Sequence, residues 1–141
     1  MSSYDMGTAI HEAAHAVVGV HKGFRVYEVY IYPDKSGQTS FGRVNYRDAA
    51  SVRLYAAAIM AGPIAELMHQ GKPTTAVNAF YLEGASADMA KFKALGEQFD
   101  LSGVFDETIT LVKTYYEAIT KVAEQLMRDG SIEGDALGGM I

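Results

Sequence analysis

The feature that most constrains the fold is the stretch from Thr8 to Gly19, which reads TAIHEAAHAVVG. Apolar residues in and around it recur at the spacing of an α-helix with one face in a core: Met6, Ile10, Ala13, Val17 and Val20. Ser2 or Ser3 can cap this helix, and Gly23 is a suitable stop. We therefore expect a largely buried helix near the start of the chain.

This helix carries the pattern HEAAH. On a helix, His11 and His15 lie one turn apart on nearly the same face, close enough for both imidazoles to bind one metal ion. Glu12 lies about 100° around the helix from His11, beside such an ion rather than over it. The spacing is the zinc metalloprotease signature. In that chemistry Glu12 would accept a proton from the attacking water and deliver it to the departing amine.

A chance match is the competing interpretation, in which these residues are only hydrogen-bonded near a core. The chain has four histidines, so an accidental HExxH pattern is expected well under about one time in a hundred. The neighbouring residues also favour a site, because small side chains leave space around the imidazoles and valines indicate a buried helix: Ala13, Ala14, Ala16, Val17 and Val18.

Two histidines do not complete a metal site, and without cysteine the further ligand must be a histidine or a carboxylate. His21 has the spacing of the HExxHxxGxxH class, but Val18 occupies the position of that motif's glycine. Glu66 belongs to a second apolar segment, and glutamate is the third ligand in some zinc proteases. Asp88 would lie in the first turn of a later helix, where the dipole favours an ionised carboxylate. The pattern alone leaves all three open.

The segments after the first helix predict a hairpin and a second helix. RVYEVYIYP, the turn-rich DKSGQTS and FGRVNY indicate two antiparallel strands, Val26 to Tyr32 and Phe41 to Tyr46. Asp48 can cap a helix over ASVRLYAAAIMAGPIAELMHQ, and Pro63 should kink or divide it.

The second half of the chain predicts further helices. GASADMAKFKALGEQF is a third, and DETITLVKTYYEAITKVAEQLMRDG is one long helix that ends at Gly130, followed by a short tail helix. Repeats and linkers are missing from the sequence. We therefore predict a single domain over residues 1–141, α+β and predominantly helical, with a small antiparallel hairpin or sheet.

Charge and hydropathy restrict the partners. The net charge is −5 and basic residues form no run, which argues against nucleic acid. The most apolar stretch, LYAAAIMAGPIAELM, is shorter than the roughly twenty residues that cross a bilayer. The start of the chain, MSSYDMG, lacks a secretory signal pattern. We expect a cytoplasmic protein that binds neither membrane nor nucleic acid.

Several segments resemble, in order, the peptidase domain of the FtsH-type ATP-dependent zinc proteases. TAIHEAAHAVVG is similar to the family's HEAGHA segment, and VYEVYIYP precedes a turn that contains glycine, as in the family. AGPIAEL is similar to a Gly-rich helix that contains Ala-Glu, and GASADM to GASND. The likeness extends weakly to the SIEGDAL tail, so it covers nearly the whole chain and implies a zincin-like metallopeptidase fold.

The resemblance implies a role for each matching residue. The zinc ligands would be His11, His15 and Asp88, with one zinc ion per chain, and Glu12 would be the catalytic base. Glu66 would then be free to accept a hydrogen bond from a ligand imidazole.

The chain departs from the family pattern at three positions. Ala14 replaces a glycine, Ala87 replaces the asparagine before the ligand aspartate, and Pro63 interrupts a helix that the family builds without it. The sequence also shows neither the ATPase module nor the membrane anchor of the family. We expect a stand-alone peptidase that acts on peptides or unfolded segments, or one that uses a separate ATPase partner. Self-association is also compatible with this resemblance, because the family's peptidase domains form rings.

A substrate peptide could add as a strand to an edge of the hairpin, which would give broad specificity. Two other hypotheses compete with the peptidase. One is a non-catalytic zinc-binding interaction module derived from a peptidase, and the other is a metal-free helical interaction domain.

Overall fold

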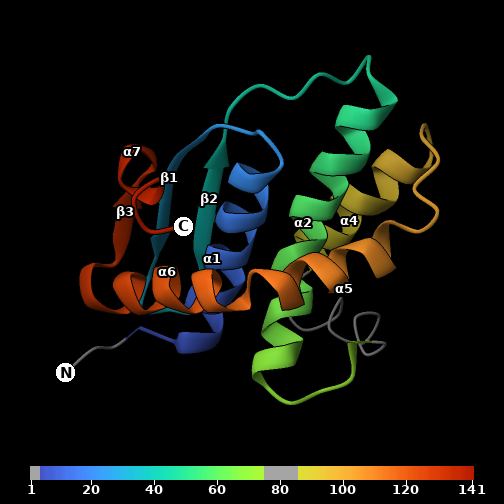
Figure 1. The fold of residues 1–141 in the computed structure, drawn as a ribbon. Helices are drawn as coiled ribbons and strands as arrows, with labels where there is room; N and C mark the ends of the chain where they lie inside the picture. The colour runs from blue at the N-terminus through green and yellow to red at the C-terminus, as the bar shows by residue number, and fades with distance from the viewer. Residues whose placement is uncertain (1–3, 75–85) are drawn as a thin grey trace.

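The computed structural model describes residues 4–74 and 86–141, which are predominantly helical with a small antiparallel sheet (Figure 1). This confirms the predicted α+β class. The elements follow in the order α1 (Met6–His21), β1 (Val26–Ile31), β2 (Gly37–Phe41), α2 (Ala49–His69), α4 (Ser86–Gly96), α5 (Val104–Thr114), α6 (Tyr116–Asp129), β3 (Ser131–Glu133) and α7 (Gly134–Leu137).

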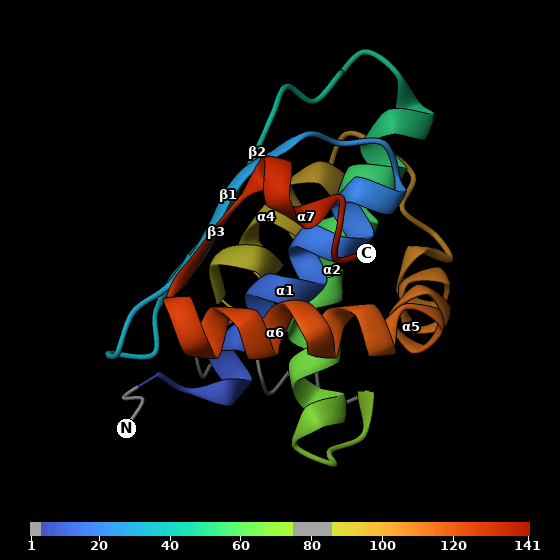
Figure 2. The same ribbon diagram turned by 60° about the vertical axis from the view of Figure 1, so that its left-hand side comes forward.

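Helix α1 lies at the centre of the structure. It packs against α2 on one side, against β1 and β2 on another, and α6 crosses it (Figures 1 and 2). Its cap is Asp5, whose carboxylate accepts a hydrogen bond from the Thr8 amide at 2.9 Å. The predicted caps, Ser2 and Ser3, lie outside the described residues. Gly23 follows the end of α1 with φ of 89°, as a glycine stop requires.

The sheet has the strand order β2-β1-β3, and both pairs are antiparallel. Strand β2 begins at Gly37, earlier than the predicted Phe41 to Tyr46, and the chain leaves the sheet after Phe41. The prediction was wrong because Gln38, Thr39 and Ser40 resemble a polar turn, although they pair with β1 as a half-exposed strand. Strand β3 has three residues and was not predicted.

Helix α2 is buried along most of its length because α1, α4 and α5 all pack on it. Asp48 caps it as predicted, accepting a hydrogen bond from the Ala50 amide at 3.1 Å. Pro63 lies inside the helix, yet α2 continues through it as a single element. Of the two expected effects of Pro63, a kink or a division, the division is therefore wrong.

The predicted long helix before Gly130 is two helices. They meet at Tyr115, where φ is −103° and ψ is 14°, and α5 and α6 then run in different directions (Figure 2). Helix α5 packs on α2, whereas α6 packs on α1. The residues around Tyr115 have no sequence signal for a break, so the different packing partners account for it. The helix over Ser86–Gly96 and the short tail helix are both present.

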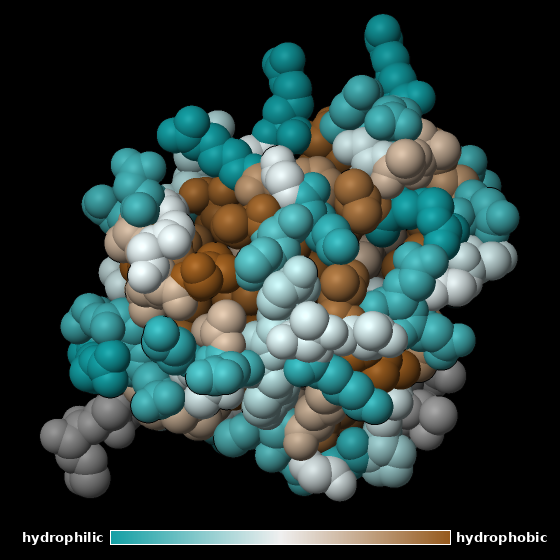
Figure 3. Space-filling view, viewed as in Figure 1, coloured by the Kyte–Doolittle hydropathy of each residue, from teal (hydrophilic) through white to brown (hydrophobic). Residues whose placement is uncertain are grey.

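The hydrophobic core lies between α1, α2, α6 and the inner face of β1. Its fully buried side chains include Val17, Ile64, Val29 and Leu126, each of which contributes about 1.5–3 kcal/mol by burial. On the face seen in Figure 3, hydrophobic side chains gather around the C-terminal end of the chain. Among the described residues, none of the helices combines the length and the apolar character needed to cross a bilayer.

Candidate metal centre

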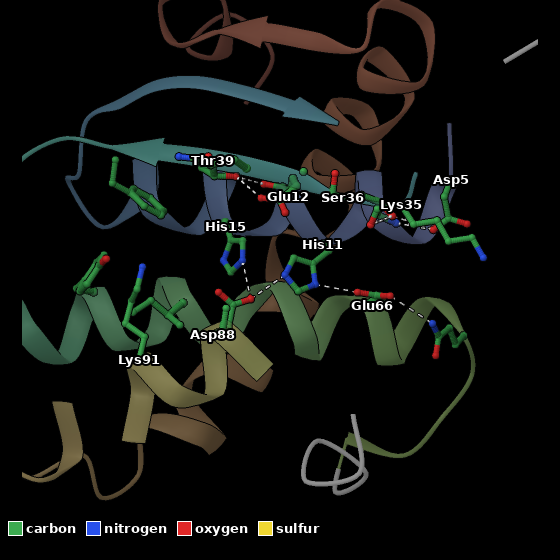
Figure 4. A pocket seen from close by; sticks show the side chains of 18 residues that line it. Asp5, His11, Glu12, His15, Lys35, Ser36, Thr39, Glu66, Asp88 and Lys91 are labelled. Atoms are coloured by element: carbon green, nitrogen blue, oxygen red, sulfur yellow. Dashed lines mark hydrogen bonds and ion pairs between the residues drawn. The ribbon is translucent and has the colours of Figure 1, made fainter. Parts of the chain in front are cut away.

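Three side chains from two helices converge on one point (Figure 4). His11 and His15 project from α1, and Asp88 projects from the first turn of α4. The Asp88 Oδ2 atom lies 2.8 Å from His11 Nε2 and 3.2 Å from His15 Nε2. One ligand atom from each residue lies within 4.8 Å of the other two. The structure thus brings together two motif histidines and an aspartate that lies 77 residues after the first of them.

The outer nitrogen of each imidazole has its own partner. His11 Nδ1 donates to Glu66 Oε1 at 2.8 Å, and His15 Nδ1 donates to the Ala58 carbonyl oxygen at 2.8 Å. A neutral imidazole that donates from Nδ1 presents the lone pair of Nε2 to the shared point. Partners of this kind orient metal-binding histidines. Glu66 contacts the outer side of His11, so the geometry favours Asp88 over Glu66 as the third donor.

The electrostatics of the cluster favour a positive charge. Burial lowers the pKa of His11, but the hydrogen bonds with Asp88 and Glu66, together with the charges of Glu12 and Asp88, outweigh it and raise the pKa to about 10. Burial also lowers the pKa of His15, yet the charge of Asp88, its hydrogen bond and the charge of Glu12 together produce a net increase. Burial raises the pKa of Asp88, but the two histidines hold it well below its usual range. A divalent cation can take the place of the ring protons in such a cluster.

At Gly62, the backbone of α2 comes close to both histidine rings. A Cβ atom at Gly62 of α2 would lie 2.5 Å from His15 Nε2 and 2.9 Å from His11 Cδ2. Only glycine leaves room for both rings at this distance, since real Cβ contacts are never this short. Gly62 was not predicted as a site residue from the sequence. A glycine inside a helix lowers its stability by about 1 kcal/mol relative to alanine. Its presence in this helical segment was therefore the signal that could have pointed to a close contact.

Glu12 lies beside the histidines and contacts the sheet. Its side chain is 7% exposed, and Thr39 on β2 places its hydroxyl 2.9 Å from Glu12 Oε1 and 3.0 Å from the Glu12 carbonyl oxygen. Within the described residues, Glu12 Oε2 has no hydrogen-bond partner, and no buried side-chain oxygen is left unsatisfied. Solvent therefore reaches Oε2. The sequence gives no signal for Thr39, because its role depends on the register of β2.

These residues line one open cavity of about 580 Å³ (Figure 4). Its lining includes the four residues predicted for the site, which are His11, Glu12, His15 and Asp88. Ala87 also lines the cavity, whereas Ala14 is fully buried and is absent from the lining. The methyl group at position 14 is therefore accommodated in the core and does not narrow the cavity.

The other two histidines lie away from this cavity. His21 stacks on Tyr115 with the ring centroids 3.9 Å apart, and His69 is exposed at the end of α2. Neither lines the cavity. His21, one of the three residues considered for the third donor, is thus excluded by its position.

The chain matches no model of a known protein family, and a search of curated proteins finds no relative. What the centre does is therefore inferred from its own residues and from the likeness of its motifs.

Proposed function

We propose that this protein is a zinc-dependent metallopeptidase with a zincin-like domain of the FtsH type. The observation that carries the proposal is the convergence of His11, His15 and Asp88 beside Glu12 in an open cavity. The motif order described for the sequence supports the same function. One zinc ion per chain would be held by the three converging side chains.

The donor set fits zinc. Two imidazole nitrogens and one carboxylate oxygen are ordinary zinc ligands, and catalytic zinc sites use three protein ligands with one open position. Both imidazoles are already oriented by partners on their outer nitrogens. When bound, zinc polarises a carbonyl group and makes a water molecule acidic near neutral pH.

Glu12 supplies the proton transfer. Its Oε2 atom is open to the cavity, while Oε1 lies within hydrogen-bonding distance of the Thr39 hydroxyl. Oε2 is thus placed to accept a proton from the water that attacks the peptide carbonyl and to return it to the departing amine. Thr39 keeps the carboxylate turned toward the cavity by holding the other oxygen.

Strand β2 is the proposed site of substrate binding. It forms one edge of the sheet, and several of its residues line the cavity beside Glu12. A flexible peptide that adds to this edge would be aligned by main-chain hydrogen bonds, which demand little of its sequence. We therefore expect cleavage of peptides and unfolded segments with broad specificity.

Metal analysis tests whether the protein binds zinc. Protein purified without added zinc should contain close to one equivalent, or should gain it on zinc addition. Less than about half an equivalent, not restored by zinc, would favour a metal-free interaction domain instead.

The variant Glu12→Gln tests whether the protein cleaves peptides with Glu12 as the base. We expect this variant to keep its zinc and to cleave a mixture of unstructured peptides about a hundredfold to ten-thousandfold more slowly than wild type. Glu28→Gln is the matched control, because Glu28 is exposed on β1. Zinc binding without cleavage by the wild type would favour the non-catalytic zinc module.

A further inference from the structure

A second hollow of about 540 Å³ opens from the candidate metal centre. We call it the side pocket and define it by Phe41, Arg43, Tyr46, Tyr55 and Lys91. Phe41, Tyr55 and Lys91 also line the cavity that contains the two histidines and Asp88. A molecule bound along β2 can therefore occupy both spaces at once.

The floor of the side pocket is aromatic. Phe41 and Tyr55 meet edge to face with centroids 5.9 Å apart, and Tyr46 meets Tyr55 in the same way at 6.2 Å. Tyr55 is 7% exposed, so α2 and the end of β2 fix this floor. Such a floor excludes water from one side of a bound group and strengthens its electrostatic contacts.

The rim of the side pocket is positively charged, although the whole chain has a net charge of −5. Arg43 follows β2, and Lys91 lies on α4 one turn after Asp88, on the same helix face. The described residues that line the pocket include no carboxylate, and neither cation forms an ion pair with a described residue. Figure 4 shows Lys91 on the same side of α4 as Asp88. At the other end of the cavity, Lys35 lies near Asp5, and Glu66 adds a second carboxylate (Figure 4).

We propose that the side pocket binds a carboxylate group of the peptide substrate, with Lys91 as a specificity-determining residue. This inference rests on the proposed peptidase function, because it places the carboxylate next to the bond that is cleaved. The carboxylate can belong to an aspartate or glutamate side chain or to the C-terminus of the peptide. Either source presents the same negative charge to Lys91 and Arg43.

Binding measurements test this without relying on turnover. The Glu12→Gln variant, supplied with zinc, is titrated with fluorescently labelled, unstructured peptides. The parent peptide is neutral and amidated, one series carries glutamate at each position in turn, and another peptide has a free C-terminal carboxylate. We expect at least one carboxylate peptide to bind about twofold to fivefold more tightly than the parent, as an accessible ion pair provides. The two kinds of peptide identify the source of the carboxylate.

Lys91→Gln, added to Glu12→Gln, should remove most of this preference. Lys93→Gln is the matched control, since Lys93 is an exposed lysine of the same helix that lines neither hollow. It should leave the preference intact. Equal binding of all peptides, no binding of any peptide, or equal effects of the two lysine variants would each overturn the inference.

Cleavage by the wild type separates this inference from the proposed function. Preferential binding to the Glu12→Gln variant without any cleavage by the wild type would support the carboxylate pocket and contradict the peptidase. Cleavage of all peptides at similar rates, together with equal binding, would support the peptidase and contradict the pocket.

Discussion

Helices α1 and α4 both contribute to the candidate metal centre, but they are held in place very differently. In α1, eleven of sixteen residues are buried, and each imidazole has a second hydrogen bond to α2. In α4, none of residues 87–96 is fully buried. Among the described residues, the only hydrogen bonds of the Asp88 side chain are those to the two imidazoles.

This difference shows how the centre is built. The packing of α1 against α2 and the outer hydrogen bonds orient the two histidines. The helix that carries Asp88 packs on the core only through partly buried side chains such as Met89 and Phe92. If zinc binds as proposed, it links a weakly packed helix to a rigid one, and binding energy contributes directly to the docking of α4.

The strongest test of this difference between α1 and α4 is the removal of the Asp88 carboxylate. Asp88→Ala should lower the zinc affinity by more than about a hundredfold, whereas Glu66→Ala, which removes an outer partner of His11, should cost about tenfold to a hundredfold. Competition with a chelator measures both. Asp106→Ala is the control, because Asp106 is an exposed carboxylate in the first turn of α5. The reverse order would reject Asp88 as the third ligand.

Gly62→Ala tests whether α1 and α2 hold the two imidazoles rigidly. The new methyl group would push against both imidazoles, so we expect the zinc affinity to fall about tenfold to a hundredfold and the free energy of unfolding to fall by about 1–3 kcal/mol. Gly96→Ala is the control, since its Cβ would make only an ordinary contact of 3.6 Å with Leu101. Unchanged affinity in Gly62→Ala would show that the rings can move, contrary to the rigid half of the comparison.

Hydrogen exchange with and without a chelator measures how strongly α1 and α4 each depend on the ion. Removal of zinc should accelerate amide exchange in α4 by about tenfold, while the central turns of α1 change little, because only α4 relies on the ion. Mass spectrometry of peptides from each helix provides the measurement. Equal acceleration in both helices would mean that the ion supports the whole core.

Thr39→Val has the smallest expected effect. Valine suits a strand but cannot donate to Glu12, so we expect kcat for peptide cleavage to fall about fivefold, equivalent to about 1 kcal/mol, with little change in KM. Thr39→Ser restores the hydroxyl and should restore most of kcat. A change in KM alone would indicate that Thr39 contacts substrate and does not position Glu12.

The sequence predicted the helices well where their signals are local. The HEAAH helix, the Asp48 cap and the helix that begins at Ser86 are all present, because caps and apolar spacing act over one or two turns. The choice of Asp88 came from the family resemblance, since helix positions alone left Glu66 as a serious rival. The structure then placed the two carboxylates on different nitrogens of His11.

What could not be predicted depends on contacts between distant segments. The break at Tyr115 follows from two packing partners, and the role of Thr39 follows from strand register. The polar composition of β2 concealed a strand because pairing with β1, rather than β propensity, holds it in place. The space at Gly62 depends on how closely α2 approaches α1.

The contacts that define the centre span 55 residues from His11 to Glu66 and 77 residues from His11 to Asp88. Contacts between positions so far apart in the chain carry a loop-closure cost and slow folding relative to local contacts. If the protein is a peptidase as proposed, a partly folded chain that has both imidazoles in place but lacks α4 would contain the whole HEAAH motif and still be unable to hydrolyse a neighbouring unfolded chain.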